Sequence, residues 1–77
     1  MPTVTIVIHD DRHADTEVTV FADQAAALEW ARAQAREFDR FGDLREELTE
    51  MMARSGWLYF ATYGEGNHIR VQPAEVR

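Results

Sequence analysis

The chain has 77 residues, of which 45% are hydrophobic and 29% charged, an ordinary balance for one small α+β domain covering residues 1–77. Fourteen acidic residues against eight basic ones give a formal net charge of −6, which opposes the phosphate contacts that direct nucleic-acid binding requires. Cysteine and lysine are absent, which excludes disulfides, thiolate metal sites and Schiff-base chemistry.

No apolar run reaches the length of a membrane-spanning helix, and the N-terminal residues lack the basic flank and the cleavage site of a secretory signal. We therefore expect a cytoplasmic protein with no membrane contact. The sequence contains no glycine-rich phosphate loop and no nucleophile motif. On this basis we expect no enzymatic activity, no catalytic residues and no cofactor.

Two alternating segments near the N-terminus predict a β-hairpin. Apolar residues recur at every second position from Thr3 to His9 and again from Glu17 to Phe21, which is the period of a half-buried strand. The polar stretch 10–15 between them is typical of a long hairpin loop. The residues expected to face the core are Val4, Ile6, Ile8, Val18 and Val20.

The apolar period becomes helical after Asp23, which is a suitable N-cap residue. The residues that share one stripe of this helix are Leu28, Ala31, Ala35, Phe38 and Phe41. Gly42 then predicts a helix stop, and Asp43 followed by Glu46 has the spacing of a capping box. We therefore expect a break near Gly42 and a second helix from Leu44 to about Arg54.

The C-terminal part predicts a second hairpin, because the strand-like run from Trp57 to Tyr63 is followed by the turn 64–67 and by another run that ends at Pro73. The residues expected to face the core are Leu58, Phe60, Ile69 and Val71. The predicted fold is a two-layer α+β sandwich with the order ββ(αα)ββ. A four-stranded, mainly antiparallel sheet of two β-hairpins is covered on one face by the broken helical segment.

One layer of helix covers only one face of such a sheet, so the outward side chains decide the predicted function. They include aromatic rings and an arginine, which are enriched in protein interfaces. The residues of this predicted interaction surface are Phe21, Trp57, Tyr59, Tyr63 and Arg70. We expect a small non-enzymatic module that binds a protein partner or forms a homodimer through this face. Two other interpretations are cross-strand pairs that only stabilise the sheet, and a platform for stacked nucleobases, which the negative net charge opposes.

A second candidate function follows from the carboxylates around the predicted helix break. They are Glu37, Asp39, Asp43, Glu46, Glu47 and Glu50. Helix capping and a solvated helix face explain them as local structure. The alternative is an acidic inhibitor of the phage or anti-defence type, whose carboxylates mimic nucleic-acid phosphates in the basic groove of a target protein.

Histidines and aspartates in the loop 9–15 and in the last hairpin raise the question of a metal site, and our prediction for the metal is none. The weak candidates are His9, Asp11, His13 and His68. Imidazole combined with carboxylate suits zinc or nickel. Aspartates are common in turns, however, because their side chains accept hydrogen bonds from the local backbone.

Overall fold

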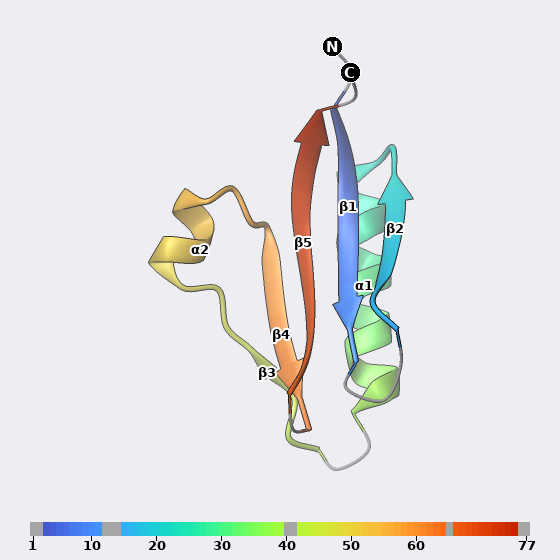
Figure 1. Cartoon of the computed structure of the whole chain (residues 1–77), viewed down its shortest axis with the longest axis vertical. Coiled ribbons are helices and arrows are strands. Elements are labelled where there is room, and N and C mark those ends of the chain that lie inside the picture. Colours follow the sequence, from blue (N-terminus) through green and yellow to red (C-terminus); the bar gives the residue numbers. More distant parts are fainter. Residues whose placement is uncertain (1–2, 12–14, 40–41, 65, 76–77) are drawn as a thin grey trace.

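The computed structural model describes residues 3–11, 15–39, 42–64 and 66–75 (Figure 1). The elements in chain order are β1 (Thr3–Asp10), β2 (Glu17–Phe21), α1 (Gln24–Phe38), β3 (Arg45–Glu46), α2 (Glu50–Arg54), β4 (Tyr59–Tyr63) and β5 (Asn67–Glu75). The strand order is β2-β1-β5-β4-β3, and all neighbours are antiparallel. The α+β class and both hairpins, β1–β2 and β4–β5, are confirmed. The sheet has five strands instead of four because the short β3 pairs with the outer edge of β4.

Helix α1 lies across one face of the sheet, behind β1 and β2 in the view of Figure 1. It begins after Asp23, as predicted, and the Asp23 carboxylate accepts a hydrogen bond from the backbone N–H of Ala25 over 3.1 Å. The residues of α1 that are fully buried are Ala27, Ala31 and Ala35. Because a methyl group projects so little, this alanine row leaves room for large side chains from the strands.

The segment after α1 differs from the second helix predicted over Leu44–Arg54. Residues Arg45–Glu46 are extended and pair with β4, and the N–H of Glu47 donates to the carbonyl of Phe60 over 3.0 Å. The predicted helix start at Leu44, with Asp43 as its cap, is therefore wrong. The free edge of β4 supplies backbone hydrogen bonds at this point, and these override the local helix propensity.

Helix α2 is a single short turn held away from the sheet. Thr49 is its N-cap, and the Thr49 hydroxyl accepts the N–H of Met52 over 3.3 Å. The chain leaves α2 through Gly56 at φ +90°, a conformation that favours glycine. No close contact joins α2 to another described element, and none of its residues is buried. Neither α1 nor α2 is long and apolar enough to cross a membrane.

The core lies between α1 and the face of the sheet that it covers. Tyr59 of β4 lies opposite Val71 of β5, and both are buried, at 7% and 0% exposed. Ile69 and Val71 face the core as predicted, but the partner of Val71 on β4 is Tyr59 and not Phe60. The predicted inward face of β4 is therefore wrong, because a shift of one residue in register exchanges the two faces of a strand.

The same exchange of faces applies to the first hairpin. Thr5, Val7 and His9 face α1 and are 4%, 0% and 6% exposed. Val18 and Val20, which were expected to face the core, are 58% and 61% exposed. The even-numbered residues of β1, β2, β4 and β5 therefore lie on the face away from α1.

Candidate interaction surface

The even-numbered residues of the four longer strands form a surface that no described element covers, and we call it the open face. Figure 1 looks onto this face, with α1 on the far side of the sheet and α2 beside it. Two halves with different chemistry meet there. The aliphatic half consists of Val4, Ile6, Ile8, Val18 and Val20, and the aromatic half consists of Phe60, His68, Arg70 and Trp57, which precedes β4.

The aliphatic half lies on β1 and on the edge strand β2. Val20 is opposite Ile6 and Val18 is opposite Ile8, so the branched side chains form two cross-strand pairs. Both valines are more than half exposed. An antiparallel sheet with one uncovered face normally carries polar residues on that face. Aliphatic residues there are instead characteristic of a surface that binds another molecule.

Arg70 is the centre of the aromatic half and lies on the middle strand, β5. Its cross-strand neighbours are Ile8 on β1 and Phe60 on β4. Its guanidinium carbon is 4.9 Å from the centroid of the Trp57 ring, a cation–π contact that holds the arginine side chain in place. The Phe60 ring is 5.7 Å from the His68 ring. The Nε atom of Arg70 is buried and has no hydrogen-bond acceptor among the described residues.

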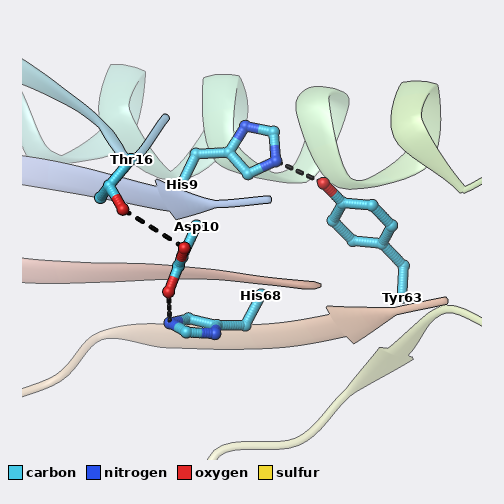
Figure 2. A network of polar contacts seen from close by, with 5 residues as sticks. All are labelled: His9, Asp10, Thr16, Tyr63 and His68. Carbon is cyan, nitrogen blue, oxygen red and sulfur yellow. Dashed lines mark hydrogen bonds and ion pairs between the residues drawn. The ribbon is translucent and has the colours of Figure 1, made fainter. Parts of the chain in front are cut away.

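A polar network lies on the helix side of the sheet (Figure 2). Nε2 of His9 is hydrogen-bonded to the hydroxyl of Tyr63, as Figure 2 shows. That hydroxyl donates to a carboxylate oxygen of Asp11 over 2.9 Å. Because a hydroxyl has only one proton, the bond to His9 must be donated by the imidazole Nε2–H. Burial, with the hydrogen bond to Asp11 and its negative charge, raises the pKa of Tyr63 above its usual value. The network therefore explains why His9 can be buried, since its ring nitrogen is hydrogen-bonded within the chain.

Tyr59 lies in an open groove at the edge of the sheet. Its hydroxyl donates to Glu46 over 2.7 Å, and the guanidinium carbon of Arg32 is 5.8 Å from the centroid of its ring. Burial, followed by the hydrogen bond to Glu46 and its charge, raises the pKa of Tyr59. The groove has a volume of about 310 Å³ and is lined by Arg32, Glu46, Glu47, Leu48, Leu58, Tyr59 and Phe60. The tyrosine hydroxyl is thus already engaged within the chain.

The residues predicted to form the interaction surface divide between the two faces. The structure places Trp57 and Arg70 on the open face, and Phe21, Tyr59 and Tyr63 on the helix face. Tyr59 and Tyr63 are 7% and 4% exposed, and the Phe21 ring packs 5.6 Å from that of Trp30 on α1. The outward orientation predicted for these three rings is wrong, because the alanine row of α1 accommodates them. The sequence signal for the aliphatic half was branched residues at alternate positions, which usually marks a core face.

The carboxylates of the predicted acidic surface mostly serve local structure. They are Glu37, Asp39, Asp43, Glu46, Glu47 and Glu50. Asp39 accepts the backbone N–H of Asp43 over 3.0 Å, and Asp43 accepts that of Gly64 over 3.1 Å. Glu46 accepts a hydrogen bond from the Tyr59 hydroxyl, and Glu50 forms an ion pair with Arg54, one turn later in α2. Four of these six carboxylates are therefore engaged inside the chain.

The weak metal candidates are not brought together in the part of the chain that the structure describes. His9 faces α1, whereas Asp10 and His68 lie on the open face (Figure 2). Asp11 accepts a hydrogen bond from the Tyr63 hydroxyl, and His13 lies outside the described residues. Within the described ranges, no group of three or more histidine, aspartate or glutamate side chains has the geometry to hold a metal ion.

No family model matches the sequence, and the comparisons with curated proteins and with solved structures gave no match either. A function therefore has to be argued from the chemistry of the molecule itself. The two features with unusual chemistry are the open face and the polar network beneath α1.

Proposed function

We propose that this chain is a non-enzymatic protein-interaction module that forms a homodimer through the open face. One observation carries the proposal: the aliphatic half of the sheet lies on the side away from α1, where Val18 and Val20 are 58% and 61% exposed. A second protein surface laid on this face removes these side chains from water, which is the main favourable contribution to association. The cytoplasm, which the sequence predicts as the location, is where we expect this association.

The size of the open face supports a dimer. The central strands have eight and nine residues and the flanking strands five each, so that, at a spacing of about 4.8 Å, the four strands cover roughly 450 Å² in projection. Two such faces in contact bury about 900 Å², the size of a weak protein interface. The open face is therefore large enough for a weak dimer.

The distribution of charge allows two copies to meet through this face. Although the formal net charge is −6, the open-face residues of the described strands include only one carboxylate, Asp10. The same residues include His68 and Arg70, and Arg45 of β3 lies beside them, opposite Thr62 of β4. The acidic excess thus lies on other surfaces. A two-fold dimer uses the same patch on both subunits, so it covers both aliphatic halves at once.

Sedimentation equilibrium and light scattering across a range of protein concentrations test this proposal. We expect the wild-type chain to be a dimer at micromolar concentration. Val20→Glu places a charge in the aliphatic half and is expected to raise the dimer dissociation constant by about tenfold or more. The matched control is Ala33→Glu, which adds the same charge at an exposed position of α1 and is expected to leave the dissociation constant unchanged.

Both substituted positions are exposed, so both variants are expected to keep the wild-type circular dichroism spectrum. A wild-type chain that stays monomeric at every concentration would refute the proposal. Equal weakening by Val20→Glu and Ala33→Glu would refute it as well, because the association would then respond to total charge and not to the open face.

A further inference from the structure

We infer that Arg70 is the polar anchor of this interface and that its guanidinium binds the carboxylate of Asp10 of the second copy. The inference rests on the proposed self-association and identifies the contact that sets its geometry. Both residues lie on the open face, Arg70 on β5 and Asp10 on the neighbouring strand β1. In a two-fold dimer the contact forms twice, since each copy supplies one arginine and one aspartate.

Arg70 is positioned to receive a carboxylate. The cation–π contact with Trp57 holds the guanidinium, and Arg70 lies between Ile8 and Phe60 at the centre of the sheet. Its Nε atom is buried among apolar neighbours and has no acceptor among the described residues. A planar guanidinium binds a carboxylate through two parallel N–H bonds, and a donor left without an acceptor in a buried place is unfavourable. A carboxylate of the second copy can bind the terminal Nη groups of this guanidinium, which lie beyond the buried Nε.

Asp10 of the same chain does not fill this role. Arg70 is opposite Ile8, so Asp10 lies one strand across and two residues along, a separation of about 8 Å between Cα atoms. The guanidinium is turned toward Trp57, which precedes β4, on the side of β5 away from β1. No ion pair joins the two described side chains. The guanidinium of one copy is therefore left to donate to the Asp10 carboxylate of the other copy.

Both carboxylate oxygens of Asp10 have only long contacts within the chain (Figure 2). Its Oδ1 accepts the hydroxyl of Thr16 over 3.3 Å, while its Oδ2 is 3.9 Å from Nε2 of His68, too far for a hydrogen bond. The Asp10 side chain is 47% exposed. It is also the only carboxylate among the open-face residues of the described strands. The alternative of two facing Arg70 side chains brings like charges together and is unfavourable.

A charge exchange tests the pair, with the dimer dissociation constant measured by sedimentation equilibrium. Arg70→Asp and Asp10→Arg each place like charges together across the interface, and each is expected to raise the dissociation constant by about 30-fold or more. The double variant Asp10→Arg/Arg70→Asp restores opposite charges with reversed polarity. We expect it to associate more tightly than either single variant. The matched control Arg36→Asp makes the same charge change on the exposed side of α1 and is expected to have no effect.

The outcomes separate this inference from the proposed function. A monomeric wild-type chain refutes both. A dimer that Val20→Glu weakens and Arg70→Asp does not refutes the inference alone. A double variant that associates no more tightly than the tighter single variant also refutes it, because the carboxylate then comes from another residue.

Circular dichroism and thermal denaturation verify that the variants fold. If Arg70→Asp does not fold, Arg70→Lys, which keeps the charge but loses the planar fork, is expected to weaken the dimer, and wild-type affinity would refute the inference.

Discussion

His9 of β1 and Tyr63 of β4 are hydrogen-bonded to each other across β5, the strand that separates them in the sheet. The two residues are 6% and 4% exposed, and the same tyrosine hydroxyl donates to Asp11, just after β1. The Tyr63 side chain thus links β4 to β1, which is not its neighbour in the sheet, and also to Asp11 just after β1. Because both ends of the His9 bond are buried, the link is expected to contribute measurably to stability.

Tyr63→Phe removes the hydroxyl and leaves the Nε2–H of His9 without an acceptor. We expect the free energy of unfolding to fall by about 1–3 kcal/mol, as for other buried donors that lose their partner. Denaturant unfolding followed by circular dichroism measures the change. The control is Thr16→Ala, which removes the exposed hydrogen bond to Asp10 and is expected to cost less than about 0.5 kcal/mol. Equal losses in the two variants would show that the buried bond has no special role.

The chain has two tyrosines, and both have a raised pKa because they are buried and donate to carboxylates, Tyr59 to Glu46 and Tyr63 to Asp11. Below the usual tyrosine pKa of about 10, both groups are protonated in the folded and in the unfolded chain, and their stabilising contribution is complete. Above it the unfolded chain releases protons that the folded chain keeps, so the free energy of unfolding falls as the pH rises. Spectrophotometric titration should show tyrosinate only as the circular dichroism signal is lost. Tyrosinate in the folded protein near pH 10 would contradict this.

The alanine row of α1 sets the distance between the helix and the sheet. Ala31 is fully buried, so Ala31→Leu adds volume where the rings of the strands already fill the space. We expect the free energy of unfolding to fall by about 1–3 kcal/mol. Ala33→Leu, at an exposed position of the same helix, is expected to change it by less than about 0.5 kcal/mol. Thermal denaturation of the two variants gives the comparison, and a stabilising effect of Ala31→Leu would reveal unfilled space beneath the helix.

Asp43 joins the segment after α1 to the turn between β4 and β5, since its carboxylate accepts the backbone N–H of Gly64. Asp43→Ala is expected to lower the free energy of unfolding by about 1 kcal/mol without a loss of helical signal in the circular dichroism spectrum. Glu37→Ala, an exposed change on the last turn of α1, serves as the control and is expected to have no effect. Loss of helical signal in Asp43→Ala would mean that Asp43 acts as a helix cap after all.

The elements with a clear local signal could be predicted from the sequence. The alternation in β1 and β2, the glycine-containing turn before β5 and the cap at Asp23 all depend on residues close together in the chain, and each is confirmed. Strand β3 could not be predicted, because two residues carry no period. Arg45–Glu46 is extended only because β4, which follows it in the chain, offers a free edge.

The orientation of the strands could not be predicted from alternation, because both faces of β1 and β4 carry apolar residues. The usual rule places the more aliphatic face in the core, yet here α1 covers Val7 and His9 and leaves Ile6 and Ile8 outside. Two facts that emerge only in three dimensions decide this. The buried row of α1 is alanine, which makes room for rings, and the hydroxyl of Tyr63 satisfies the polar group of His9.

The pairing of β1 with β5 has a consequence for how the chain acquires its structure. Thr3 lies opposite Glu75, so the first and the last strand in the sequence meet in the middle of the sheet. During synthesis on a ribosome, the early hairpin and α1 are made before residues 67–75. Long-range pairing of this kind slows folding, because the chain loses entropy when a large loop closes, before the stabilising contacts between the strands have formed. We therefore expect this chain to fold late, in one concerted step, after residues 67–75 have left the ribosome.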